Sequence, residues 1–186
     1  MVLEAEQNHN QMDAKLRKIK AFVFDVDGVL TDGGILSTPD GDLLRVFDSK
    51  DSFALRMAYM KGYHVGVITG GVSESIKLRF RTCGVPQENI YLGSRAKIED
   101  FQDFCDRHQL HADEVMYFGD DLPDIPVMLA CGCGVCPSDA VDEVKEIADY
   151  ISSRPGGKGC ARDTMQMVMK VQGKWNLDVQ EYKAKF

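Results

Sequence analysis

Two aspartates stand one residue apart directly behind a short apolar segment, Ala21–Phe24, in the order Asp25-Val26-Asp27-Gly28. A short apolar run is typical of a buried strand, and alternate residues of an extended chain point to the same side. We therefore expect Asp25 and Asp27 to lie together where a strand runs out into a loop. A strand followed by an ordinary turn would use the same residue types, so this segment alone leaves both interpretations open.

This pair of carboxylates suits phosphoryl transfer. One carboxylate can attack phosphorus while the other gives a proton to the departing oxygen, provided that their surroundings differ. Because phosphate and carboxylate are both anions, they need a cation between them, and Mg2+ prefers carboxylate oxygens, waters and phosphate. A site of this kind would require more acids and a basic residue further along the chain.

Two later segments offer such partners. The apolar run 65–68 leads into Thr69-Gly70-Gly71, whose hydroxyl and backbone amides could hold a phosphate. Lys97 follows the short segment 90–93 and begins a helical pattern, so its ammonium group could neutralise phosphoryl charge. Each feature is also typical of a strand–helix loop or of a solvated lysine, and neither decides the function alone.

The strongest partner is a cluster of acids behind the apolar segment Val115–Phe118, in the order Gly119-Asp120-Asp121-Leu122-Pro123-Asp124. Open parallel sheets bind ligands beyond the carboxyl ends of their strands, where this cluster and the first pair would meet. The acids would also suit the N-terminus of a helix, and both interpretations can hold together.

Strand and helix signals alternate along the chain. This alternation predicts an α/β fold, a doubly wound Rossmann-like parallel sheet with helices on both faces. Residues 33–47 instead carry alternating apolar residues around Pro39-Asp40-Gly41, which predicts a small β-hairpin flap. The flap is too short to be a cap domain.

In order and spacing, these motifs resemble the four motifs of the haloacid-dehalogenase-like phosphatases. Three further segments, 31–34, 47–51 and 156–159, narrow the resemblance to the cap-less branch that acts on 3-deoxy-D-manno-octulosonate 8-phosphate. Four ordered motifs are far more specific than any one of them. The similarity covers residues 19–175, which we expect to form a single phosphatase domain.

The remaining residues are expected to lie outside that domain. We expect the polar residues 1–18 to form a leader and residues 176–186 to form a C-terminal tail. A length of 186 residues suits one domain with a sizeable core, so no second domain is needed.

The resemblance implies an Mg2+-dependent phosphoric monoester hydrolase of lipopolysaccharide precursor synthesis that acts through an aspartyl-phosphate intermediate. It implies that Asp25 is the nucleophile and that Asp27 is the general acid, which later serves as the base for water. Thr69 and Lys97 would hold the phosphoryl oxygens.

The resemblance also implies a metal site and a substrate site. Mg2+ would be held by the Asp25 side chain, the Asp27 backbone carbonyl and Asp120, with Asp121 or Asp124 supporting them. The residues that match the family's contacts to the sugar acid are Asp48, Ser49, Lys50, Asp51, Ser52, Arg56, Gly70 and Arg79.

One position departs from the family pattern. Many relatives carry arginine immediately after the Thr-Gly pair, and a branch that acts on a nine-carbon sugar acid 9-phosphate carries glutamate, whereas this chain has Gly71. A phosphatase of the nine-carbon substrate therefore stays an alternative. We hypothesise that Arg56 or Arg79 recognises the substrate carboxylate instead.

Without a cap domain, another surface must exclude water from the site. The resemblance implies a homotetramer in which the flaps pack together and a neighbour's C-terminal segment reaches the cleft. Here that role would fall to Gly156-Gly157-Lys158-Gly159 and Arg162, although a glycine-rich loop before a helix would have the same sequence.

A receiver-like phospho-accepting signalling module is the non-enzyme alternative, because it also combines strand-end acids, a threonine and a lysine on a doubly wound sheet. Receivers pair adjacent acids after their first strand, whereas Asp25 and Asp27 alternate around Val26. The spacing therefore favours the phosphatase.

The resemblance implies a small sugar acid phosphate as the partner, and composition argues against two other classes of partner. The formal charge of −7 argues against a nucleic-acid surface, and no apolar stretch approaches the roughly twenty residues of a membrane helix. With no signal peptide recognised, we expect a cytoplasmic protein whose six cysteines are free thiols.

The cluster Cys131, Cys133 and Cys136 could suggest a soft-metal site, but small residues around a buried strand explain it better.

Overall fold

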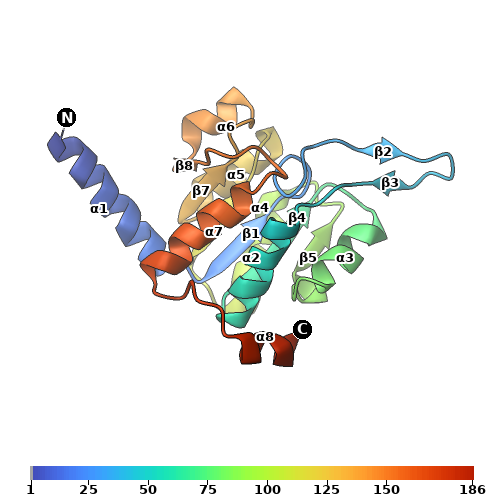
Figure 1. Cartoon of the computed structure of the whole chain (residues 1–186). Helices are drawn as coiled ribbons and strands as arrows, with labels where there is room; N and C mark the ends of the chain where they lie inside the picture. Colours follow the sequence, from blue (N-terminus) through green and yellow to red (C-terminus); the bar gives the residue numbers. More distant parts are fainter. Residues whose placement is uncertain (1) are drawn as a thin grey trace.

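A six-stranded sheet lies at the centre of the protein, with the strand order β5-β4-β1-β6-β7-β8 (Figure 1). The computed structural model describes residues 2–186, and their side chains from residue 10 onward. All neighbouring strands of this sheet run parallel, which confirms the predicted doubly wound α/β fold. The strands are β1 (Ala21–Phe24), β4 (His64–Thr69), β5 (Ile90–Leu92), β6 (Val115–Phe118), β7 (Cys133–Cys136) and β8 (Tyr150–Ile151).

Helices cover both faces of the sheet (Figure 1). One layer contains α1 (Val2–Lys18), α2 (Ser49–Met60), α3 (Glu74–Arg81) and α7 (Cys160–Val171). The other contains α4 (Lys97–His108), α5 (Ile125–Ala130) and α6 (Asp142–Ile147). The short 3₁₀ helices η1 (Gln87–Asn89), η2 (Ala112–Glu114) and η3 (Leu122–Asp124) precede β5, β6 and α5. None of the helices within residues 2–186 has the length and apolar composition that crossing a membrane requires.

The central strand β1 is buried on both of its faces, as an uninterrupted apolar sequence predicts for a parallel strand. Phe22 and Phe24 belong to the core under the first helical layer, whereas Ala21 and Val23 belong to the core under the second. Both layers therefore hold the strand in place immediately before Asp25.

Both terminal segments contain helices. The leader predicted at 1–18 forms α1, apart from Met1, which lies outside the described residues. Helix α1 contacts α7, and Leu16 is buried in the core, so the end of this segment is anchored to the domain. The tail predicted at 176–186 contains α8 (Val179–Lys185), which packs against α2.

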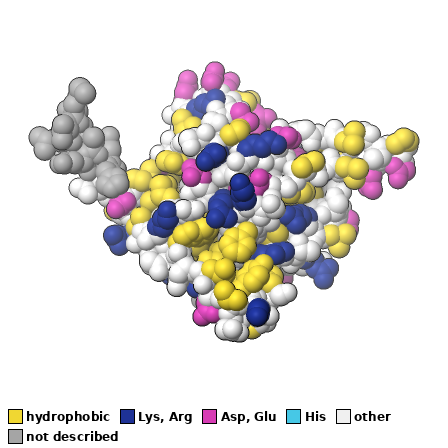
Figure 2. Space-filling model, viewed as in Figure 1, with side chains coloured by type: hydrophobic (Ala, Val, Ile, Leu, Met, Phe, Trp, Pro, Cys, Tyr) yellow, Lys and Arg dark blue, Asp and Glu magenta, His cyan; other side chains and the backbone are white. Residues whose placement is uncertain are grey.

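An antiparallel hairpin of β2 (Leu36–Ser37) and β3 (Leu43–Leu44) extends away from the sheet (Figure 1), which confirms the predicted flap. Figure 2 shows hydrophobic side chains along this hairpin and acidic side chains near its tip. Four apolar residues of this hairpin are exposed to solvent. They are Ile35, Leu36, Leu44 and Val46.

Candidate active site

The carboxyl edge of the sheet brings the predicted motifs together. Phe24 pairs with Val67 on β4 and with Phe118 on β6. The residue after Phe24 therefore lies beside the residue after Phe118, and the backbone N–H of Asp25 donates to the carbonyl of Phe118 at 2.9 Å. Thr69 ends β4 on the other side of β1. Three motifs that are far apart in the sequence thus meet at one edge.

A cleft of about 310 Å³ opens at this edge. It contains all the residues predicted for catalysis and for binding or supporting the metal, together with Gly70 from the predicted substrate set. Its lining residues are Asp25, Asp27, Thr69, Gly70, Gly71, Ser94, Arg95, Lys97, Asp120, Asp121, Pro123 and Asp124.

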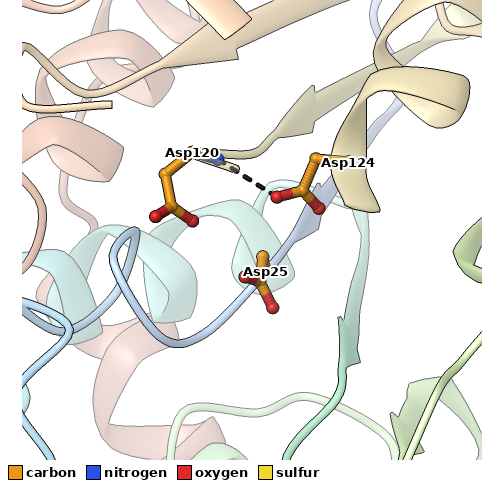
Figure 3. A group of neighbouring side chains, drawn as sticks. All are labelled: Asp25, Asp120 and Asp124. Atoms are coloured by element: carbon orange, nitrogen blue, oxygen red, sulfur yellow. Dashed lines mark hydrogen bonds between the residues drawn. The ribbon is translucent and has the colours of Figure 1, made fainter. Parts of the chain in front are cut away.

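Three carboxylates gather in this cleft, from the segments that follow β1 and β6 (Figure 3). Asp25 follows β1, Asp120 follows β6, and Asp124 ends η3, directly before α5. Each offers one oxygen, and these oxygens all lie within 4.8 Å of one another. The backbone N–H of Asp120 donates to Asp124 Oδ2 at 3.1 Å, the contact drawn in Figure 3.

Asp124 is fully buried, and both of its carboxylate oxygens accept hydrogen bonds. Its Oδ1 accepts from Lys97 Nζ at 2.7 Å and from the hydroxyl of Tyr117 at 2.6 Å. Its Oδ2 accepts from the backbone N–H groups of Asp120 and Asp121, at 3.1 and 3.3 Å. Asp124 is therefore committed to holding the loop and the lysine, whereas the exposed Asp121 caps η3 through Leu122 N.

Asp120 differs from Asp124 in the hydrogen bonding of its carboxylate. Within the part of the chain whose side chains are described, its Oδ1 is buried and has no hydrogen-bond partner. Its carboxylate lies so close to Gly28 that a Cβ atom there would fall 2.0 Å from Asp120 Oδ2, and Gly28 has a φ of +91°. A buried carboxylate oxygen without a donor costs free energy unless a cation meets it, and oxygen ligands suit Mg2+.

The pKa values of the carboxyl groups in the cleft also indicate a cation site. Burial, reinforced by the charge of Asp124 and opposed by Lys97, raises the pKa of Asp25 from 3.8 to about 7. Burial and then the charges of Asp25 and Asp124 raise the pKa of Asp120 to about 8. A cation between these carboxylates would favour their charged forms, so the residues present fit a divalent metal ion.

The cleft also holds the predicted phosphate contacts. Lys97 begins α4, its side chain is only 6% exposed, and its Nζ lies 3.1 Å from Asp25 Oδ1. Thr69 is buried at the end of β4, where its Oγ1 accepts from the backbone N–H of Gly71 at 3.1 Å. An ammonium group beside Asp25 and a strand-end hydroxyl therefore line the same cleft.

Arg45 is a residue of this site that sequence reasoning missed. It follows β3 in the flap and pairs with Asp27 through two hydrogen bonds, Nε to Oδ1 at 2.6 Å and Nη2 to Oδ2 at 2.9 Å. No periodicity or motif marks Arg45, because the flap brings it to Asp27 only after folding. Ser94 and Arg95 were findable, since they follow β5 just as Thr69 ends β4.

The other predicted substrate residues lie around α2 and make contacts within the protein. Asp48 caps α2 by accepting from Lys50 N and Asp51 N. Ser52 accepts a hydrogen bond from Arg79. None of this group lines the cleft among the described residues, and their substrate role stays a prediction. The group comprises Asp48, Ser49, Lys50, Asp51, Ser52, Arg56 and Arg79.

The glycine-rich segment 156–159 packs against the loop that follows β1. The backbone N–H of Gly157 donates to the carbonyl of Val29 at 2.9 Å, and Lys158 Nζ lies 3.6 Å from Asp32 Oδ2. A second cavity beside it is lined by the basic residues Lys50, Arg154, Lys158 and Arg162, together with Gly159, Asp163 and Gln166.

Comparison with known proteins agrees with this geometry. Residues 87–162 match the family model of the haloacid dehalogenase-like hydrolases. The chain is 34% identical to the 3-deoxy-D-manno-octulosonate 8-phosphate phosphatase of Escherichia coli K12 over 161 residues, which cover 87% of this chain and 85% of that protein.

Solved structures share the whole architecture. A HAD-superfamily hydrolase (subfamily IIIA) from Legionella pneumophila is 33% identical and superimposes with a TM-score of 0.92 over 98% of this chain and 99% of that chain. The 3-deoxy-D-manno-octulosonate 8-phosphate phosphatase from Moraxella catarrhalis, solved in complex with magnesium, phosphate and KDO, is 26% identical, with a TM-score of 0.85 over 95% and 98%. The chain therefore belongs to the haloacid-dehalogenase-like hydrolases, in the family of the 3-deoxy-D-manno-octulosonate 8-phosphate phosphatases.

Proposed function

We propose that this protein hydrolyses 3-deoxy-D-manno-octulosonate 8-phosphate to the free sugar acid and phosphate, as an Mg2+-dependent step in lipopolysaccharide precursor synthesis. The observation that carries the proposal is the meeting of Asp25, Lys97 and Asp120 in one cleft at the carboxyl edge of the sheet. Membership of a hydrolase family disfavours the receiver-like alternative, which predicts no turnover.

The proposed chemistry uses the cleft's own residues. A carboxylate oxygen of Asp25 attacks phosphorus, the bond from phosphorus to the sugar oxygen breaks, and Asp27 gives a proton to that oxygen. Asp27 then takes a proton from the water that hydrolyses the aspartyl-phosphate. Thr69 and Lys97 hold the phosphoryl oxygens during both steps, and the position of Lys97 beside Asp25 supports this assignment.

The metal assignment rests on the free oxygens of the site. Asp25, the backbone carbonyl of Asp27 and Asp120 would hold Mg2+, while Asp121 and Asp124 support them. The unpaired Oδ1 of Asp120 and the full hydrogen bonding of Asp124 support this division of roles. When bound, the ion would supply positive charge that offsets the acids and the phosphate.

The direct test measures phosphate release by the purified protein from the eight-carbon and nine-carbon sugar acid phosphates, with Mg2+ and with EDTA. We expect Mg2+-dependent release, faster with the eight-carbon substrate, and no turnover by Asp25→Asn. Faster release from the nine-carbon substrate would favour the alternative, and no release from either would reject the proposal.

We further propose a cytoplasmic homotetramer whose flaps pack together. The exposed apolar residues Leu36 and Val46 of the flap support an interface there, and the six free cysteines suit a reducing compartment. Light scattering should return the mass of a tetramer, and Leu36→Asp with Val46→Asp should lower it. A monomer with full activity would contradict the assembly.

A further inference from the structure

Arg45 occupies the space that Gly71 leaves open. A Cβ atom built on Gly71 would lie 3.1 Å from Arg45 Nη2, so the guanidinium group rests against the loop that follows β4. Its side chain is only 2% exposed, although it comes from the flap. The positive charge that a side chain at position 71 could supply is therefore supplied here by a residue from another segment.

The Arg45 guanidinium is fixed on several sides. It donates two parallel hydrogen bonds to the carboxylate of Asp27, and its Nη1 donates to the carbonyl of Leu43 at 3.2 Å. A bidentate arginine–carboxylate pair of this kind is both strong and specific in geometry. The contact links the end of the flap directly to the residue proposed to protonate the leaving oxygen.

This pairing has a chemical consequence. Both oxygens of Asp27 accept from N–H groups of Arg45, so a carboxyl proton aimed at the leaving oxygen competes with the guanidinium for the same carboxyl group until the pair opens. Opening the pair without a replacement would leave a largely buried guanidinium without its carboxylate, which is costly. A second carboxylate, brought in by the substrate, would be a replacement of matching shape and charge.

We propose that Arg45 is a specificity-determining residue that selects phosphate esters carrying a carboxylate. In the free protein Arg45 holds Asp27, and the substrate's carboxylate takes the place of Asp27 on the guanidinium, which frees Asp27 for proton transfer. This inference rests on the proposed function, since it assigns the acid group of that substrate to Arg45. The sequence hypothesis gave this role to Arg56 or Arg79, which donate to Tyr182 and Ser52, whereas Arg45 donates to Asp27, a residue that lines the cleft.

The test compares matched esters that differ only at the acid group, using the Mg2+-loaded full-length protein. One pair is 3-deoxy-D-manno-octulosonate 8-phosphate and its C1 methyl ester, and the other is 6-phosphogluconate and glucitol 6-phosphate. For Arg45→Met, the ratio of kcat/KM for the acid to kcat/KM for the neutral ester should fall about 10- to 100-fold, the worth of one charged hydrogen-bonding contact. For Arg45→Lys, which keeps the positive charge but cannot donate two parallel hydrogen bonds, the ratio should lie between those of the unchanged protein and Arg45→Met.

Retained or increased turnover of the neutral esters by Arg45→Met would show that the variant is folded. Arg81→Met removes the same charge from an exposed position on α3 and should leave both ratios unchanged. An unchanged ratio in Arg45→Met, or an equal loss on acid and neutral esters, would overturn the inference. If the eight-carbon substrate is not hydrolysed but the second pair still shows the Arg45-dependent ratio, the proposed function fails and the selection by Arg45 stands.

Discussion

The ammonium group of Lys97 donates a 2.7 Å hydrogen bond to the carboxylate of Asp124, and both side chains are buried. Lys97 also forms an ion pair with Asp25, in which Nζ lies 3.1 Å from Asp25 Oδ1. The pair therefore has two functions: it holds a cation beside the proposed nucleophile, and it neutralises a carboxylate that cannot reach water.

We expect Lys97→Met to lower kcat by about 10²- to 10³-fold, because one preorganised contact to the transferred phosphoryl group is lost. The same change should lower the free energy of unfolding by about 3–5 kcal/mol, because Asp124 stays buried without its partner. Steady-state kinetics and urea unfolding would measure the two effects.

The double variant Lys97→Met with Asp124→Asn separates these effects. It should regain part of the lost stability, since the unpaired charge is gone, but none of the lost kcat. A double variant that recovered activity would mean that Lys97 acts only by neutralising Asp124.

Asp120→Asn tests the metal site through stability alone. In EDTA at a pH above the Asp120 pKa of about 8, this variant should melt at a higher temperature than the unchanged protein, because it removes a buried negative charge whose Oδ1 has no partner among the described residues. The unchanged protein should gain about 2.7 kcal/mol when Mg2+ is present at a hundred times its Kd, and Asp120→Asn should lose this gain.

Thermal melts with and without Mg2+ would measure both effects. Asp142→Asn is the matched control, since the side chain of Asp142 is 95% exposed on α6. If Asp120→Asn kept the full Mg2+ shift, Asp120 would not be a ligand.

The sequence was sufficient to place most of the cleft, for a topological reason. Parallel strands end at one edge, so polar residues that follow β1, β4 and β6 must gather there whatever the details of packing. Asp25, Thr69 and Asp120 were predictable in this sense. Their strands are short apolar runs, and burial on both faces of the sheet fixes where each strand ends.

The positions of Arg45 and of α8 were not predictable, because they depend on contacts between distant polar side chains. Arg45 reaches Asp27 across the flap, and Arg56 bonds Tyr182 from the far end of the chain. Such contacts leave no periodicity in the sequence. The same limit applies to α2, where Asp51, which we predict to contact the substrate, also ties α2 to the start of α7.

The buried carboxyl group of Asp51 should make stability depend on pH. Burial raises its pKa from 3.8 to about 6, although it accepts hydrogen bonds from the backbone N–H groups of Gly159 and Arg162. Because the folded protein holds this proton more tightly than the unfolded chain, its stabilising effect is complete below about pH 4 and is lost as the pH rises to about 6.

The loss over that interval should be on the order of 3 kcal/mol. Urea unfolding at several pH values should show that Asp51→Asn removes this part of the slope, while Asp106→Asn, at an exposed position of α4, retains it. Identical slopes in Asp51→Asn and the unchanged protein would show that Asp51 titrates normally.

Variants of Arg56 would show whether this residue binds the substrate or only anchors α8. Its Nη1 donates to the hydroxyl of Tyr182 at 2.9 Å, and its Nε donates to the carbonyl of Thr82 at 3.0 Å, so it fastens α8 and the end of α3 to α2. Arg56→Met and Tyr182→Phe should each lower the free energy of unfolding. A double-mutant cycle should give a coupling of about 0.5–1.5 kcal/mol, the worth of one hydrogen bond.

Kinetics then decide between the two roles. If Arg56 only anchors α8, both variants leave KM for the eight-carbon substrate unchanged. If Arg56 also binds the sugar acid, KM rises in Arg56→Met and stays unchanged in Tyr182→Phe, because only the first variant removes a charge that a carboxylate could meet. We expect the first result, since the guanidinium of Arg56 is already engaged by α8 and by Thr82, outside the cleft that holds Asp25.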